Sequence, residues 1–252
     1  MKLSQRLQYI LEQIPPGSVL ADIGSDHALL PVAAVLSGRA IKAVAGEVNA
    51  GPLRAARKQV ADAGLADKID VRHGDGLEVV ESGEADVITI AGMGGALIAT
   101  ILDEGTGKLS GVCQLVLQPN VGEDMLRNWL LHSGWVVTGE HILEEDGKIY
   151  EVLTALPESQ SPLSQEELYA PVQLAGGCKL DSGLLLRMGP HLVKAPNEVF
   201  FKKWQGEIAK LQSVLKQVER SELESAREKR EELRRQIEQL EEVLACLQRH
   251  KP

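Results

Sequence analysis

The sequence predicts an α/β fold: a Rossmann-like sheet of seven strands, mostly parallel, whose last two strands form an antiparallel hairpin, followed by a C-terminal helical hairpin. Two observations support this. In the first half of the chain, apolar runs typical of buried strands alternate with amphipathic helical segments, which is the pattern of a parallel sheet covered by helices. From residue 196 onward, apolar residues recur at steps of four and three, as in packed helices.

The predicted elements follow one another in a regular order. An amphipathic helix begins the chain and ends at Pro15-Pro16-Gly17. The parallel strands are expected at residues 19–23, 40–47, 69–72, 85–91 and 114–118, and the helices at residues 29–36, 49–63, 95–102 and 123–133. Asn49 is the expected N-cap of its helix, and Gly64 ends that helix. Pro119-Asn120 is expected to close the fifth strand.

The segment GWVVTGEHILEEDGKIYEVLTAL predicts two long strands joined by Asp146-Gly147, a dipeptide typical of tight hairpin turns. A hairpin at the end of a parallel sheet fits seven-stranded methyltransferase sheets better than six-stranded dehydrogenase sheets. This part of the interpretation is an analogy between folds.

Two helices of similar length are predicted at the C-terminus, interrupted where residues 221–224 match a capping box. We interpret them as an antiparallel coiled-coil hairpin, with one continuous dimerising helix as the rival interpretation. The expected organisation is a ligand-binding domain at residues 1–160, a connecting segment at 161–195 and a coiled-coil arm at 196–252. We expect a monomer rather than a homodimer.

Composition excludes several classes of protein. The net charge of −9 disfavours a uniformly basic nucleic-acid surface, although the arm is nearly neutral. Its basic residues are either a solvated face or phosphate contacts, and the cluster comprises Arg227, Lys229, Arg230, Arg234 and Arg235. The three cysteines lack metal-ligand or redox spacing, so no metal site is expected. No segment reaches the ~20 apolar residues of a membrane span, so we expect a cytoplasmic protein with no membrane partner.

Polar residues and glycines follow the carboxyl ends of the predicted parallel strands. Because these ends meet at one edge of an open sheet, a ligand site is expected there. The candidates at this edge are Asp22, Gly24, Glu47, Asp75, Gly76, Gly92 and Asn120.

Three of these residues suit an adenosine-containing cofactor. Gly24 allows a ligand to approach the backbone closely. Glu47, 23 residues later, stands where an acidic residue binds two ribose hydroxyls. Asp75 can accept a hydrogen bond from the exocyclic amine of adenine. Both NAD and S-adenosylmethionine would satisfy these positions.

The stretch VLADIGSDHALLP separates the two cofactors. The pyrophosphate of NAD requires free backbone N–H groups and glycines, and Asp26 would repel it. S-adenosylmethionine carries a positive ammonium and a positive sulfonium, so carboxylates at Asp22 and Asp26 are compatible with it. The alternative is that Asp26 only caps a helix and His27 is only an exposed residue of its first turn.

Several longer motifs resemble one family. The segments ADIGSDHALLP, GEVNAGPLRAARKQV, VRHGDGLEVV, GEADVITIAGMGGALI, LVLQPN and ILEEDGKIYEVL together resemble the bacterial tRNA (adenine-22-N1)-methyltransferases, up to about Trp204. The resemblance implies a class I methyltransferase domain that binds S-adenosylmethionine, with C-terminal helices that assist tRNA binding. The AGMGG segment replaces the Asp/Asn-Pro-Pro-aromatic motif of many amino-methyltransferases, so the mechanism of that motif is not transferred.

The expected activity is therefore methyl transfer from S-adenosylmethionine to N1 of an adenine in tRNA. Adenine N1 has a free lone pair at neutral pH, so the enzyme must mainly position the base and stabilise the positive charge that develops on it. Asp26, His27 and Asn120 are the catalytic candidates. Two alternatives remain open: a methyltransferase acting on a protein or a small molecule, and a non-catalytic nucleotide-binding module that dimerises through its helices.

Overall fold

The structure is a computed structural model that describes residues 3–174, 177–219 and 224–249 of the chain. It separates into two compact units, residues 1–168 and residues 169–252. Each unit is described by itself.

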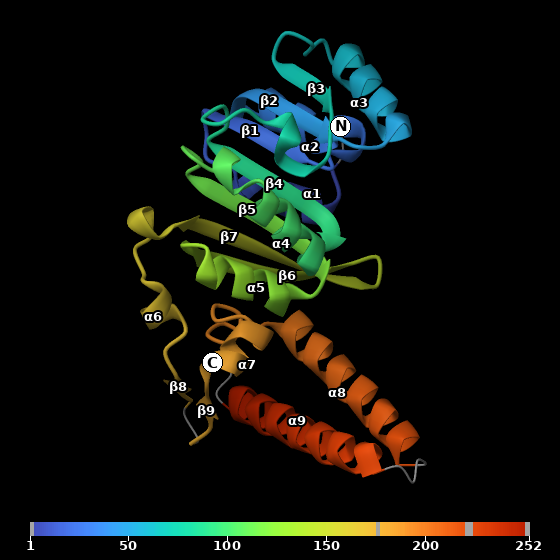
Figure 1. Ribbon diagram of the computed structural model, residues 1–252, viewed down its shortest axis with the longest axis vertical. Helices are drawn as coiled ribbons and strands as arrows, with labels where there is room; N and C mark the ends of the chain where they lie inside the picture. Colours follow the sequence, from blue (N-terminus) through green and yellow to red (C-terminus); the bar gives the residue numbers. More distant parts are fainter. Residues whose placement is uncertain (1–2, 175–176, 220–223, 250–252) are drawn as a thin grey trace. The chain divides into compact units, whose positions relative to one another are not determined.

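The first unit is built on a seven-stranded sheet with the strand order β3-β2-β1-β4-β5-β7-β6 (Figure 1). The strands are β1 Ser18–Ile23, β2 Ala40–Glu47, β3 Ile69–His73, β4 Val87–Gly94, β5 Gln114–Val121, β6 Trp135–Glu145 and β7 Lys148–Pro157. Strands β1 to β5 are parallel, whereas β7 runs antiparallel to both β5 and β6. The predicted sheet with a final antiparallel hairpin is therefore confirmed.

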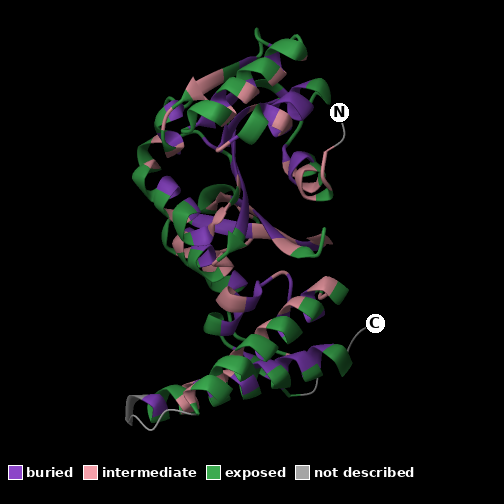
Figure 2. Ribbon diagram, turned by 90° about the vertical axis from the view of Figure 1, so that its right-hand side faces the viewer, coloured by how far each residue is buried: buried purple, intermediate pink, exposed green. Residues whose placement is uncertain are grey.

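Helices cover both faces of this sheet. They are α1 Gln5–Gln13, α2 Leu29–Leu36, α3 Ala50–Asp62, α4 Gly95–Glu104, α5 Glu123–His132 and α6 Gln165–Leu168, with short 3-10 turns η1 Asp26–Ala28, η2 Gly76–Val79, η3 Thr106–Lys108 and η4 Glu158–Gln160. Helices α1, α2 and α3 pack as one group, and α4 packs against α5 as another. Central strands lie buried between the helical layers (Figure 2).

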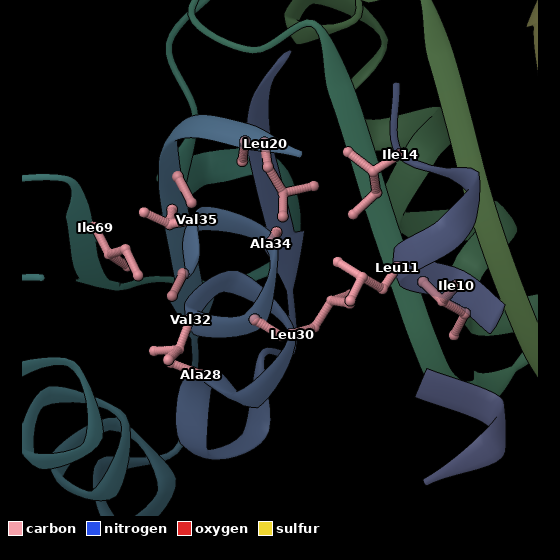
Figure 3. Close-up of a cluster of buried hydrophobic side chains, with 14 of the residues drawn as sticks. Ile10, Leu11, Ile14, Leu20, Ala28, Leu30, Val32, Ala34, Val35 and Ile69 are labelled. Carbon is pink, nitrogen blue, oxygen red and sulfur yellow. The ribbon is translucent and has the colours of Figure 1, made fainter. Parts of the chain in front are cut away.

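Helix α1 contributes directly to the core. Ser4 caps it by accepting a 3.2 Å hydrogen bond from the backbone N–H of Leu7. Ile10, Leu11 and Ile14 are buried, and Leu11 points toward Leu30 of α2 (Figure 3). Burying an aliphatic side chain of this size stabilises the fold by roughly 1.5–3 kcal/mol. The start of the chain is thereby fixed to the sheet domain.

One local prediction is wrong, and a second is correct only in position. Strand β5 does not close at Pro119-Asn120 but continues to Val121, with Pro119 paired to Met93 at an irregularity in the register. Proline is tolerated there because a ladder irregularity does not require its missing N–H. Asn49 occupies the N-cap position of α3 but does not cap it, because its amide donates a hydrogen bond to Glu47 instead.

A buried ionic cluster, which no local sequence pattern predicts, lies between α5 and the β6–β7 hairpin. Arg127 donates to Glu140 at 2.6 Å and to Glu151 at 2.5 Å, and all three side chains are fully buried. Burial alone would lower the pKa of Arg127, but the two glutamates raise it above its ordinary value. The guanidinium therefore stays charged and fixes α5 to the hairpin.

The second unit is mainly helical. It contains β8 Val172–Gln173, β9 Lys179–Leu180, α7 Ser182–Met188, α8 Glu198–Val218 and α9 Glu224–Arg249. Hydrogen bonds from Gln212 to Glu241 and from Arg234 to Glu219 show that α8 and α9 run antiparallel. The chain therefore reverses direction here, and a single continuous helix is excluded. The predicted capping box at residues 221–224 lies outside the described residues.

Cys178 and Cys246, distant in sequence, contact each other through their thiols, and burial is the largest of the effects that raise the pKa of Cys178 to about 11.

Among the helices that the structure describes, none has the length and apolar character needed to cross a membrane.

Replacing Arg127 with methionine should lower the free energy of unfolding by about 3–5 kcal/mol, because two buried carboxylates would lose their counter-charge. Urea denaturation measures this. The matched control is Lys58→Met, which breaks the exposed pair with Asp62 and should change stability by no more than about 0.5 kcal/mol. Equal effects of the two substitutions would show that the buried cluster does not anchor α5.

Candidate functional site

The carboxyl ends of the parallel strands meet at one edge of the sheet. Ile23 of β1 pairs with Gly46 of β2 on one side and with Ile90 of β4 on the other, and Gly94 of β4 pairs with Val121 of β5. The structure thus brings the residues predicted for cofactor binding and catalysis to this single edge. Their individual environments differ.

Asp22 is buried near the end of β1 and holds the turn that follows. Its carboxylate accepts hydrogen bonds from the hydroxyls of Ser25, at 2.5 Å, and Thr89, at 2.6 Å. Burial raises its pKa from 3.8 to about 6, even though both hydroxyl bonds lower the pKa. Because the folded state binds this proton more tightly than the unfolded chain, the associated stability is present below pH 3.8 and is lost as the pH rises through about 6.

The turn after β1 has an unusual backbone. The N–H groups of Gly24 and Ser25 both donate to the carbonyl of Gly46 at 3.0 Å. Gly24 has a φ of +69°, which would strain any other residue, and a Cβ at this position would displace the flexible end of Met93, whose Cε atom would be 2.2 Å away. Asp26, His27 and Ala28 then have φ values of 24°, 65° and 55°, a left-handed run without glycine. Such conformations cost about 1–3 kcal/mol each and are typical of functional sites.

Asp26 and His27 project from this left-handed turn into solvent. Their side chains are 76% and 56% exposed, with the Asp26 Oδ1 atom 3.4 Å from Nε2 of His27. Asp26 makes no capping hydrogen bond, since Ser25 and Ala28 occupy the N-cap positions of η1 and α2. The interpretation of Asp26 as only a helix cap is therefore wrong, and the carboxylate is available to a ligand.

Glu47, at the end of β2, is buried but only partly engaged. Its Oε1 atom accepts hydrogen bonds from the backbone and the side-chain amide of Asn49, at 2.9 and 3.3 Å. Within the described residues no donor reaches its Oε2 atom. One carboxylate oxygen of a rigidly held glutamate is thus left for a hydroxyl-bearing ligand.

Asp75 and Gly76 follow β3. Asp75 is exposed, and its N–H donates to the Glu78 carboxylate at 3.3 Å. Gly76 has a φ of +50° and lies against Ile101 of α4. A cavity of about 190 Å³ opens beside these residues.

A buried amide connects the ends of β4 and β5, where the register is irregular between Ala91 and Met93 and Gly92 has a φ of +80°; we call this irregularity of β4 the Gly92 turn. Gln118, fully buried, accepts from the N–H of Gly92 at 3.2 Å and from the Arg6 guanidinium, and donates to Asn120 at 3.1 Å. Asn120 in turn donates to the carbonyl of Gly92 at 2.7 Å. Asn120 thus holds the Gly92 turn in place. Sequence analysis did not identify Arg6, because nothing local links the first helix to this edge.

An apolar rim borders the same edge. Leu97, Val121 and Met125, on α4, β5 and α5, are 52%, 67% and 55% exposed. We call these three residues the aliphatic rim. Exposed aliphatic side chains beside a polar site offer a flat surface to an apolar or aromatic ligand group.

The acidic side chains at this edge fit S-adenosylmethionine. Four carboxylates gather at the edge, namely Asp22, Asp26, Glu47 and Asp75, and they suit a cofactor that carries positive charge. The open Oε2 atom of Glu47 suits a ribose hydroxyl, and Gly24 leaves room at the backbone. No group of three or more metal-ligating side chains occurs in the described part of the chain.

Comparison with known proteins identifies one family. The sequence profile described as tRNA (adenine(22)-N(1))-methyltransferase matches residues 20–242. A Bacillus subtilis (strain 168) protein of that name is 47% identical over 245 residues, covering 97% of this chain and 98% of its own.

Solved structures agree with this result. The crystal structure of the Bacillus subtilis M1A22 tRNA methyltransferase superposes with a TM-score of 0.86 at 46% identity, covering 96% of this chain and 98% of that one. A Streptococcus pneumoniae protein solved in complex with S-adenosyl-L-methionine superposes with a TM-score of 0.80 at 41% identity, covering 96% of this chain and 100% of that one.

Replacing Thr89 with valine removes one of the two hydroxyls that stabilise the Asp22 carboxylate. We expect a loss of unfolding free energy of about 1–3 kcal/mol at pH 8, where Asp22 is ionised, and a smaller loss at pH 5, where it is mostly protonated. Thr100→Val, at an exposed site on α4, is the control. Denaturant titrations at both pH values measure the effect, and a loss independent of pH would contradict this role of Thr89.

Proposed function

This chain belongs to the tRNA (adenine(22)-N(1))-methyltransferase family, and on that premise we propose how its own residues carry out the reaction. The protein transfers a methyl group from S-adenosylmethionine to N1 of adenine 22 in tRNA. The observation that carries this conclusion is the match to the family over nearly the whole chain, with the acidic sheet edge as its physical counterpart.

Three positions account for the adenosine half of the cofactor. The open carboxylate oxygen of Glu47 accepts from the ribose hydroxyls, and the exposed carboxylate of Asp75 accepts from the adenine amine. Gly76 lets the backbone lie close to the ring. Support for this assignment comes from the rigid hold of Asn49 on Glu47, which prepares the carboxylate before binding.

The methionine half lies between the turn after β1 and the Gly92 turn at the end of β4. S-adenosylmethionine supplies an electrophilic methyl group on its positive sulfonium. Asp22 and the neighbouring Gly24 provide a negative potential and backbone access on one side, and the Gly92 turn borders the other. Because the Gly92 turn is held by Gln118 and Asn120, we assign Asn120 a positioning role.

The target adenine requires a partner for its exocyclic amine. As N1 is alkylated, positive charge spreads to this amine, which becomes a stronger hydrogen-bond donor. A carboxylate beside it stabilises the transition state more than the ground state. Asp26 is exposed and makes no capping hydrogen bond, so it is our candidate for the partner of the exocyclic amine. His27 lies beside it and is assigned to contact the base or to accept a proton.

The adenine must leave its stack to reach this edge, because its N1 atom is not accessible within a helix. The aliphatic rim formed by Leu97, Val121 and Met125 offers a surface for the extruded nucleoside.

Phosphate contacts are assigned to local basic patches, because the sheet domain is acidic overall. In the arm, Arg227, Lys229 and Arg234 pair with glutamates at 2.7–3.5 Å. These exposed pairs are weak, so a phosphate can compete for them. We expect the enzyme to act as a monomer in the cytoplasm, and sedimentation at several concentrations tests the first expectation.

The direct test is methyl transfer from radiolabelled S-adenosylmethionine to a tRNA transcript, with a transcript carrying guanine at position 22 as control. We expect incorporation only with adenine 22, and mapping of the product to N1. Label in a protein or a small molecule, but not in tRNA, would support the alternative substrate classes.

Replacing Glu47 with alanine should weaken S-adenosylmethionine binding by about 10- to 100-fold, because hydrogen bonds between a carboxylate and two hydroxyls are lost. Isothermal calorimetry measures this change. The control Glu12→Ala alters an exposed residue of α1 and should leave the dissociation constant unchanged. Undiminished binding by Glu47→Ala would remove Glu47 from the site.

Replacing Arg227, Lys229, Arg234 and Arg235 together with glutamine should weaken tRNA binding and flatten its salt dependence, by up to about one unit of log–log slope per lost phosphate contact. Fluorescence anisotropy at several salt concentrations measures both. S-adenosylmethionine affinity serves as the internal control and should not change. An unaltered salt slope would show that the arm face is only solvated.

A further inference from the structure

Arg6 is brought to the sheet edge by an unusually well anchored first helix. The backbone N–H groups of Gln5 and Arg6 donate to the Glu145 carboxylate of the β6–β7 hairpin at 2.6 and 3.3 Å. Tyr9 stacks on His141 of the same hairpin with ring centroids 3.9 Å apart. The start of α1 is thus fixed close to the Gly92 turn, far along the chain.

The Arg6 guanidinium lies directly against that turn. Its Nη1 atom donates to the buried side-chain oxygen of Gln118, and its Cζ atom lies 5.2 Å from the ring centroid of Tyr150. The same Nη1 atom would be 3.8 Å from a Cβ placed on Gly92. Arg6 therefore contacts the same turn as the residues assigned to the methionine half of the cofactor.

No carboxylate of the described residues forms an ion pair with Arg6. The side chain is partly buried, and its charge is met by a neutral amide and an aromatic face. A guanidinium has five N–H donors in a planar fork that matches a carboxylate in two parallel hydrogen bonds. Its position and spare donors suit a bound anion.

We propose that Arg6 binds the α-carboxylate of S-adenosylmethionine. The acidic edge suits the ammonium and sulfonium of the cofactor, but Asp22 and Asp26 would repel its carboxylate. Arg6 supplies the missing positive partner, beside the Gly92 turn. This assignment rests on the cofactor stated above and extends it to the one anionic group of that cofactor.

The test compares S-adenosylmethionine with decarboxylated S-adenosylmethionine, which keeps the sulfonium and the amine but lacks the carboxylate. By calorimetry, Arg6→Met should weaken binding of the intact cofactor by about 10- to 100-fold, the loss typical of a charge-assisted bidentate contact. The same variant should bind the decarboxylated ligand with an affinity within about twofold of wild type. Neither the wild-type protein nor the variant can form the contact between Arg6 and a carboxylate with this ligand. Arg6→Lys should restore part of the affinity for the intact cofactor only.

Arg39→Met is the matched control. Arg39 also holds α1 in place, through hydrogen bonds of 2.7 Å to the carbonyls of Glu12 and Ile14, but makes no contact with the Gly92 turn. Any loss caused by displacing α1 should affect both ligands equally in this variant.

Three results would overturn the proposal. Equal losses for both ligands in Arg6→Met would show that Arg6 only shapes the site. Unchanged cofactor affinity with weakened tRNA binding would assign Arg6 to a tRNA phosphate instead. Unchanged affinity for the cofactor and for tRNA would leave Arg6 no role in binding. If the wild-type protein bound neither ligand, the assignment of S-adenosylmethionine as the cofactor would be wrong. That outcome is distinct from the three above, which concern Arg6 alone.

Discussion

The buried carboxylate of Asp22 is the constraint on which the sheet edge depends. It sits at the end of a central strand, and two hydroxyls, one from the following turn and one from β4, hold it there. These bonds fix the turn in which Gly24 packs against Met93 and the chain enters a left-handed run. The left-handed backbone of that run is conformationally unfavourable, and the same turn exposes the side chains of Asp26 and His27 at the edge. Strained backbone of this kind is typical of functional sites.

The second feature of the edge is that its turns are held by side chains from distant parts of the chain. Gln118 connects the ends of β4 and β5, and Arg6 reaches the same amide from the first helix. The edge is therefore preorganised, with carboxylates on one side and a guanidinium on the other. Such a distribution of charge matches a cofactor that is itself both cationic and anionic.

Features of the fold that local sequence signals determine could be predicted. Alternation of strands and helices predicted the sheet, and Asp146-Gly147 predicted the hairpin because its turn needs positive φ at both residues. Glu47 and Asp75 could be placed at the edge because Glu47 ends one predicted parallel strand and Asp75 follows another. Features that depend on tertiary contacts could not be predicted: the Asn49 amide binds Glu47 and makes no capping hydrogen bond, and Arg127 contacts its glutamates only when α5 packs against the hairpin. The left-handed turn at Asp26 could not be predicted, because it contains no glycine, the residue that usually indicates positive φ.

The central claim is that the sheet edge places a buried carboxylate where a cationic cofactor binds. The most direct test follows the carboxyl carbon resonance of Asp22 by NMR as the pH is raised, with and without saturating S-adenosylmethionine. In the free protein Asp22 should titrate with a pKa of about 6, and the positive charges of the cofactor should lower that pKa. A free-protein pKa at the ordinary 3.8, or a pKa that the cofactor leaves unchanged, would contradict the account.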